Sequence, residues 1–258
     1  MNEGAIVDRL LASWHSGHFD ATPASEGDLS LEDGLALQLQ LLERLEGEGE
    51  QLGGWKVGLT SGAALDRMGP GFRPFGFLLA SRIFASGATA MLGGGLDGVE
   101  GELCVRLGAP LRGPSVTPAE ARAAVCAPGG AVLAGLELNA KGRYTGKSAA
   151  LQIANNMTNW GIVVGDEISP VPVDQDLDTL EVRLEQDGAE VGRQAAAGHV
   201  EDHFLSLSRL AQQLDRFGRG LEPGQRVITG ALVRTTVSGP TRVAAQFRDI
   251  GGVAIELA

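Results

Sequence analysis

The chain has 258 residues and a net charge of −11, with 43% hydrophobic and 21% charged residues. This length can bury one sizeable core, and the composition is typical of a soluble globular protein. The acidic surplus argues against nucleic-acid binding, which rewards clustered Lys and Arg. No apolar run reaches the ~18 residues that a membrane helix needs. The first residues lack the pattern of a signal peptide, so a cytoplasmic protein is expected.

The first fifty residues are predicted to be helical. A capping box at Ser30 and Asp33 precedes a leucine-rich segment, and apolar residues recur at helical spacing near the start of the chain: Ile6, Leu10, Leu11 and Trp14. From Gly53 onward, short apolar runs alternate with turn-forming residues. We therefore expect a soft boundary near residue 52. It separates a helical N-terminal subdomain (1–52) from a β-rich catalytic domain (53–258).

The rest of the chain is predicted to consist mainly of strands. Residues 99–107 alternate strictly, and Asp187-Gly188 marks a hairpin. The segment 202–217 has helical spacing, with Asp202 as its N-cap and His203 on the surface. Further strands are expected at 132–139, 160–164, 180–184, 190–193, 227–232, 243–247 and 253–257. The prediction is an α+β protein, rich in strands, with a helical N-terminal region.

Three glutamates are the first candidates for chemistry. Glu100 and Glu102 lie two residues apart in one strand, so both carboxylates leave the same face about 7 Å apart at Cα. Glu137 lies between Leu136 and Leu138, where an unpaired carboxylate is costly to bury. A hard divalent cation such as Mg²⁺ or Mn²⁺ would accept all three. By spacing alone, the commoner alternative is three exposed glutamates on half-exposed strands.

Lys56 is the second candidate. It lies among small and apolar residues in the segment Gly53-Gly54-Trp55-Lys56-Val57-Gly58. Burial there would lower its pKa and suit it to acid–base work. The alternative is a lysine on the exposed face of a short strand.

Several motifs together resemble one family, the hydratase/decarboxylase branch of the fumarylacetoacetate hydrolase superfamily. They run in family order from roughly residue 5 to the C-terminus. The motifs are Gly54-Trp55-Lys56-Val57-Gly58-Leu59-Thr60-Ser61, Pro74-Phe75-Gly76-Phe77-Leu78, Val99-Glu100-Gly101-Glu102, Gly135-Leu136-Glu137-Leu138, Ile153-Ala154-Asn155-Asn156, Leu221-Glu222-Pro223-Gly224 and Thr229-Gly230-Ala231-Leu232.

The resemblance implies a mixed β-sandwich roll and a Mg²⁺ or Mn²⁺ ion held by the three glutamates. The ion would chelate a small 2-oxo acid and stabilise its enolate. Lys56 matches the active-site lysine of the family. The expected substrate-binding residues are Thr60, Ser61, Lys141, Asn155 and Asn156. A homo-oligomer is expected, and a partner enzyme of the same pathway, in aromatic catabolism, is a further implication.

The chain departs from the family at three acidic positions. No acid follows the Phe-Gly element in Leu79-Ala80-Ser81-Arg82, Asn155 replaces an Asp, and Asn139 stands where an acid is usual. Because Asn cannot act as a carboxylate base, the acid–base step is expected to differ. The reaction therefore stays open between hydration and decarboxylation. Alternatives are hydrolysis of an acylpyruvate-type C–C bond and a weakened subunit that binds a partner enzyme.

Three other residues are weaker candidates for the pocket. Thr158 is a polar pocket candidate or a turn residue, and His199 is a weak pocket candidate. Cys104 shares the face of the glutamates but is better explained as a small buried packing residue.

Overall fold

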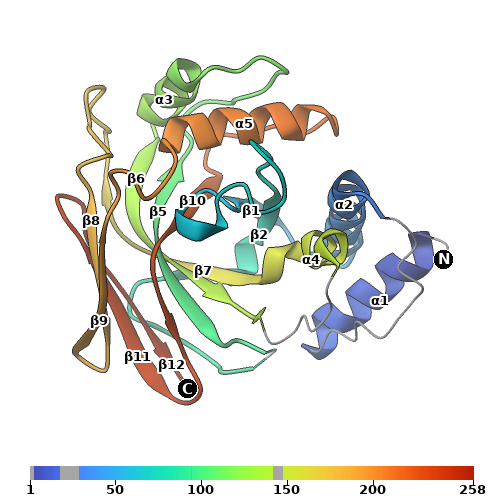
Figure 1. Ribbon diagram of the computed structural model, residues 1–258, viewed down its shortest axis with the longest axis horizontal. Helices are drawn as coiled ribbons and strands as arrows, with labels where there is room; N and C mark the ends of the chain where they lie inside the picture. The colour runs from blue at the N-terminus through green and yellow to red at the C-terminus, as the bar shows by residue number, and fades with distance from the viewer. Residues whose placement is uncertain (1–2, 18–28, 94, 142–147) are drawn as a thin grey trace.

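The computed structural model describes residues 3–17, 29–93, 95–141 and 148–258 (Figure 1). The described helices are α1 (Glu3–Ser16), α2 (Leu31–Gly47), α3 (Pro118–Cys126), α4 (Ala149–Ala154) and α5 (His203–Asp215). None of these helices is long and apolar enough to span a membrane. Part of the predicted basic segment after Asn139, Gly142-Arg143, lies outside the described residues.

The strands form two sheets. The seven-stranded sheet has the order β2-β1-β10-β5-β6-β7-β3. Its strands are β1 (Leu52–Val57), β2 (Phe75–Leu79), β3 (Ile83–Ala85), β5 (Gly98–Arg106), β6 (Ala131–Asn139), β7 (Asn159–Ile168) and β10 (Arg226–Thr236). The five-stranded sheet has the order β4-β12-β11-β8-β9. Its strands are β4 (Ala88–Ala90), β8 (Glu181–Gln186), β9 (Ala189–Ala195), β11 (Thr241–Phe247) and β12 (Gly251–Leu257).

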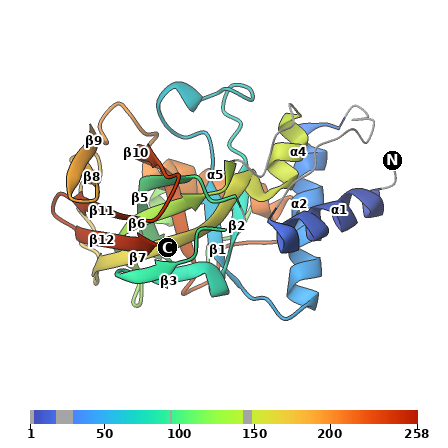
Figure 2. The same ribbon diagram turned by 90° about the horizontal axis from the view of Figure 1, so that it is seen from below.

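The larger sheet curls, and this curl creates the interior in which the site lies. Leu78 of β2 and Ile162 of β7 belong to one buried apolar cluster, although most of the sheet lies between their strands. Cys104 of β5 is buried in the same cluster, which confirms its packing role. The smaller sheet packs against the outer face, where β12 contacts β6 and β7. Figures 1 and 2 show the two sheets on one side and α1, α2 and α4 on the other.

The predicted α+β, strand-rich class is confirmed, and the local signals explain why. Ser30 and Asp33 form the expected capping box at the start of α2. Asp187 and Gly188 both have positive φ (51° and 79°), as a two-residue hairpin turn requires. The first helices pack on the strands, with the Trp14 and Phe77 ring centroids 5.4 Å apart. The proposed division at residue 52 stays a prediction.

His203 corrects one prediction. Asp202 caps α5 as expected, since its carboxylate accepts a hydrogen bond from the Leu205 N–H at 2.6 Å. This cap sets the phase of the helix so that His203 faces β10 and is 1% exposed, not on the surface. Its Nδ1 lies 2.7 Å from Thr229 Oγ1. Burial lowers the pKa of His203 to about 4.

This pKa makes stability fall in mild acid. The unfolded chain binds a proton to His203 near pH 6.5, whereas the folded chain does so only near pH 4, so stability is lost as pH falls through this window. We expect wild type to lose about 2 kcal/mol more than His203→Gln between pH 7 and pH 5. Urea unfolding at both pH values measures the difference. Parallel losses in the two proteins would contradict it.

Candidate metal site and cavity

Four charged side chains converge at one end of the concave face of the curled sheet. Glu100 lies opposite Glu137 in the β5–β6 ladder, Glu102 follows on β5, and Lys56 projects from β1. Glu100, Glu102, Glu137 and Lys56 are 7%, 3%, 1% and 6% exposed, respectively. One oxygen from each glutamate lies within 4.8 Å of the others. The alternative of exposed strand glutamates is therefore wrong, and so is that of an exposed lysine.

Each carboxylate has a different partner. Lys56 Nζ lies 2.5 Å from Glu137 Oε1, and Asn159 Nδ2 donates to the same oxygen at 2.7 Å. Lys141 Nζ donates to Glu100 at 2.9 Å. Glu102 receives a hydrogen bond only from the Gly230 backbone N–H, at 2.9 Å, among the contacts described. Glu102 is thus the carboxylate of the three without a cation in direct contact.

The pKa shifts follow from these partners. Burial, then the Glu137 and Glu100 charges, raises the pKa of Glu102 well above its usual value. Burial also opposes ionisation of Glu100, but the Lys141 and Lys56 charges outweigh it and lower that pKa. For Lys56, burial acts to lower the pKa, yet the three carboxylates outweigh it and raise the pKa. The expectation of a lowered lysine pKa is wrong because it omitted the glutamates.

This donor set fits a hard divalent cation. Three buried carboxylates with one buried ammonium leave negative charge that is costly without a further positive partner. The raised pKa of Glu102 reflects the same cost, because burial and the Glu137 and Glu100 charges disfavour its ionised form. Oxygen ligands of this kind suit Mg²⁺ or Mn²⁺. We regard Glu100, Glu102 and Glu137 as the residues that could hold the metal.

A cavity of about 320 Å³ opens onto the carboxylates. Thr60, Ser61 and Lys141 lie in its lining, as does Thr158. The remaining polar lining includes Asn139, where an acid is usual in the family, and three residues to which sequence reasoning gave no role: Arg67, Gln152 and Arg234. Asn139 is 2% exposed, and its Nδ2 has no hydrogen-bond partner among the described residues. A buried amide group thus lies unpaired in the wall of this cavity.

Asn155 and Asn156 do not line this cavity. The Asn156 side chain is instead bonded to β2. It accepts a hydrogen bond from the Phe77 N–H at 2.7 Å and donates one to the Phe77 carbonyl at 3.0 Å. Residues 156–158 all have positive φ, a conformation that Asn tolerates better than most residues. The two hydrogen bonds to Phe77 hold this turn so that Met157 and Thr158 line the cavity.

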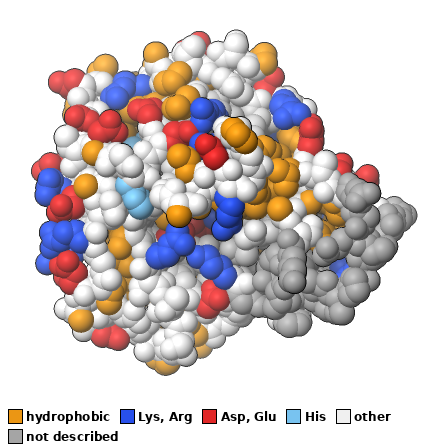
Figure 3. All heavy atoms as spheres, in the orientation of Figure 1, with side chains coloured by type: hydrophobic (Ala, Val, Ile, Leu, Met, Phe, Trp, Pro, Cys, Tyr) orange, Lys and Arg blue, Asp and Glu red, His pale blue; other side chains and the backbone are white. Residues whose placement is uncertain are grey.

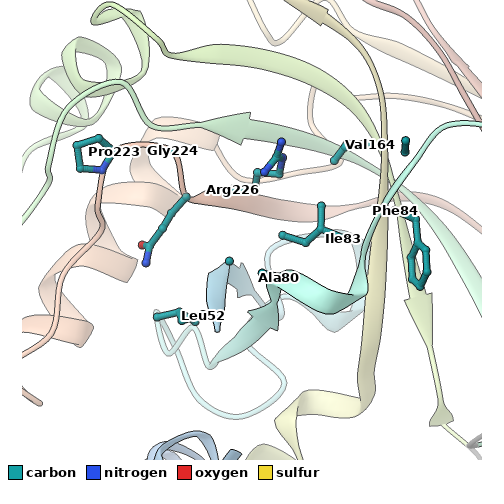
Figure 4. A pocket seen from close by; sticks show the side chains of 11 residues that line it. Leu52, Ala80, Ile83, Phe84, Val164, Pro223, Gly224 and Arg226 are labelled. Atoms are coloured by element: carbon teal, nitrogen blue, oxygen red, sulfur yellow. The ribbon is translucent and has the colours of Figure 1, made fainter. Parts of the chain in front are cut away.

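The three missing acids are not equivalent in the structure. Asn139 lies in the lining, whereas Ser81 donates a hydrogen bond to Glu50 at 2.6 Å, outside it. Ala80 lines a separate cavity of about 410 Å³, which lies around Arg226 and is drawn in Figure 4. That cavity lies at the opposite end of the curled sheet, because Arg226 in its lining pairs with Arg106, at the far end of β5 from Glu100. Its described lining contains no carboxylate.

Sequence reasoning missed Asn159, Arg67 and Arg234. Asn159 begins β7 directly after the Asn155-Asn156 motif, and Arg234 lies opposite Glu100 in the β10–β5 ladder. The motif Thr229-Gly230-Ala231-Leu232 lies in β10, but it ends two residues before Arg234 and gave no signal for that residue. Arg67 lies in a loop segment without any motif, so no local signal could have found it.

Comparison with known proteins decides the family. No family model matches the chain. The 2-hydroxypent-2,4-dienoate hydratase of Pseudomonas putida is 30% identical over 197 residues, which cover 74% of this chain and 85% of the hydratase. The chain belongs to the hydratase/decarboxylase family of the fumarylacetoacetate hydrolase superfamily. A second relative in this family, 4-oxalocrotonate decarboxylase of Pseudomonas putida, is 26% identical and covers 88% of this chain and 85% of the decarboxylase.

Solved structures of the superfamily share the fold. The 4-oxalocrotonate decarboxylase of Pseudomonas putida G7, complexed with magnesium and adipate, matches with a TM-score of 0.88 at 21% identity. That match covers 100% of this chain and 99% of the decarboxylase. Fumarylpyruvate hydrolase of Pseudomonas aeruginosa, in complex with Mn²⁺ and pyruvate, matches with a TM-score of 0.58 at 17% identity, covering 79% and 88%. The family fold thus accommodates divalent metals.

Gly230 couples the backbone to the carboxylates and provides a test. Its φ is +137°, and an added Cβ would lie 2.1 Å from Thr60 Oγ1. Gly230→Ala should displace Thr60 and the N–H that binds Glu102, so we expect a lower Tm and at least about tenfold weaker Mn²⁺ binding. Gly224→Ala is the matched control, since its φ is +85° but its added Cβ meets no atom within 4 Å. Equal Mn²⁺ affinity in the two variants would contradict the assignment.

Proposed function

We propose that the chain is a metal-dependent lyase, of the hydratase or decarboxylase type, that acts on a small unsaturated or substituted 2-oxo acid. The observation that carries the proposal is the buried glutamate trio at the wall of a cavity of about 320 Å³. Such a cavity suits a ligand of a few carbon atoms. The hydratase and decarboxylase relatives support this reaction class.

Glu100, Glu102 and Glu137 would hold Mg²⁺ or Mn²⁺. When bound, the ion would supply Lewis-acid chemistry at the carboxylate and 2-oxo oxygens of the substrate. The strands would fix the three carboxylates before the ion arrives, because all of β6 and all of β5 except Arg106 is buried. This rigidity is what a catalytic metal site requires. The decarboxylase structure with magnesium and the hydrolase structure with Mn²⁺ support the choice of metal.

Lys56 would act on the substrate from the β1 side. Its Nζ is held by Glu137 and faces the cavity, so it can donate a hydrogen bond to a bound oxo acid. Asn139 adds a buried amide that has no partner among the described residues, and Thr60 and Ser61 add hydroxyl groups. Lys141, at the cavity mouth, supplies positive charge toward Glu100 and the substrate. These groups would orient the acid and stabilise charge that develops on it.

The proposal leaves hydration and decarboxylation open. Hydration requires delivery of a proton and a water molecule, whereas decarboxylation requires mainly an electron sink. The Asn139 amide replaces an acid of the family inside the lining and cannot serve as a base. We also propose a cytoplasmic enzyme that self-associates, with association to a partner enzyme of the same pathway as a further possibility to be tested.

Direct assay tests the proposed function. Purified protein with Mg²⁺ should consume 2-hydroxypentadienoate or 4-oxalocrotonate, followed by ultraviolet absorbance and CO₂ release, and EDTA should abolish the turnover. CO₂ release distinguishes the two reactions. No turnover of either acid with metal bound would contradict the proposal.

Lys56→Met tests the role of the lysine, because Met keeps the length of the side chain without its charge. We expect kcat to fall at least about 100-fold while Mn²⁺ still binds. Lys141→Met is the comparison, since Lys141 is half-exposed at the cavity mouth and should have a smaller effect on kcat. Intact turnover in Lys56→Met would remove the lysine from the mechanism.

A further inference from the structure

The cavity beside the glutamates continues into a second one of about 360 Å³. The two share Ser61, Ala64, Arg67, Ala231 and Arg234 in their linings. The second cavity extends away from the carboxylates to His199, along the apolar segment Ala231–Val233 of β10. A chain of several carbon atoms anchored at the glutamates can therefore pass the two arginines.

Arg67 and Arg234 mark the junction of the two cavities. Arg67 is exposed, and its guanidinium has no side-chain partner among the described residues. The nearest carboxylate to Arg234 is that of Glu100, with Nε 3.7 Å from Oε1, too long for a direct hydrogen bond. Figure 3 shows Lys and Arg side chains gathered in the middle of the face that Figure 1 presents. Two guanidinium groups are thus available to a ligand at the junction.

The charge of the lining indicates what this ligand carries. In the described lining, the three glutamates face four cationic side chains, Lys56, Lys141, Arg67 and Arg234. A divalent ion would leave that lining with three positive charges in excess. A 2-oxo monocarboxylate would neutralise one of them, whereas a dicarboxylate would neutralise two and a third on forming its enolate. Guanidinium groups bind carboxylates in a two-pronged geometry that lysine cannot offer.

We propose that Arg67 and Arg234 form a distal-carboxylate site, so that the substrate is a dicarboxylic 2-oxo acid. This inference rests on the proposed function, since the glutamate trio must first anchor the 2-oxo end. The distal carboxylate lies at the junction of the two cavities, with the carbon chain between it and the metal. His199 lies beyond it, at the far end of the second cavity.

Two unreactive acids of equal length test the proposal. Calorimetry with the Mg²⁺-loaded protein compares 2-oxoadipate, which carries a second carboxylate, with 2-oxohexanoate, which carries a methyl group instead. We expect 2-oxoadipate to bind at least about tenfold more tightly. Arg67→Gln and Arg234→Gln should each remove most of this preference and leave 2-oxohexanoate affinity within about twofold. Arg242→Gln, an exposed arginine on β11, is the matched control and should keep the preference.

The outcomes separate the inference from the function on which it rests. Equal affinity for the two acids overturns the distal site while leaving the metal-anchored 2-oxo acid intact. Equal weakening of both acids in the Arg67 and Arg234 variants also overturns it, because that result indicates a general effect of charge. If neither acid binds in a Mg²⁺-dependent way, the proposed function itself fails.

Discussion

The structure depends on the burial of three carboxylates at one end of a curled sheet. Glu100 and Glu137 face each other across the β5–β6 ladder, where like charges are destabilising. Lys56 offsets part of this repulsion through its ion pair with Glu137. A buried charge without such a partner costs several kcal/mol. The fold retains the cluster nonetheless, which is expected of a functional site and not of a packing core. A divalent cation held by the three glutamates would supply the missing positive charge.

The curl of the sheet gives its two ends different chemistry. Along β5, the concave face passes from Glu100 through buried Cys104 to Arg106, which pairs with Glu167. The apolar cluster around Cys104 separates the acidic end from the cavity that contains Arg226. At the acidic end, the cavity is lined in part by the turn at residues 156–158, and its cations come from segments far apart in the chain: Lys56, Arg67, Lys141 and Arg234. The proposed metal and substrate chemistry would therefore take place at one end of the sheet.

Local patterns predicted the strands well, because alternation and turn residues act within a few positions. The Asp187-Gly188 hairpin and the paired Glu100 and Glu102 were found in this way. The burial of His203 and the raised pKa of Lys56 could not be found, since both depend on strands distant in sequence. Arg67 was not predicted either, because it lies in a loop segment without a motif and reaches the cavity only in the folded chain. The family resemblance pointed to the three glutamates that the structure brings together, but it also predicted Asn156 as a substrate-binding residue, whereas Asn156 is bonded to Phe77 and does not line the cavity.

The central claim is that the three glutamates form one metal site. Calorimetric titration of Mn²⁺ into wild type, Glu102→Gln and the control Glu256→Gln tests it most directly. Glu102 has no cation in direct contact among the described residues, and Glu256 is exposed on β12. The account predicts one Mn²⁺ per chain in wild type and control, and at least about 100-fold weaker binding in Glu102→Gln. Equal affinity in all three proteins would contradict it.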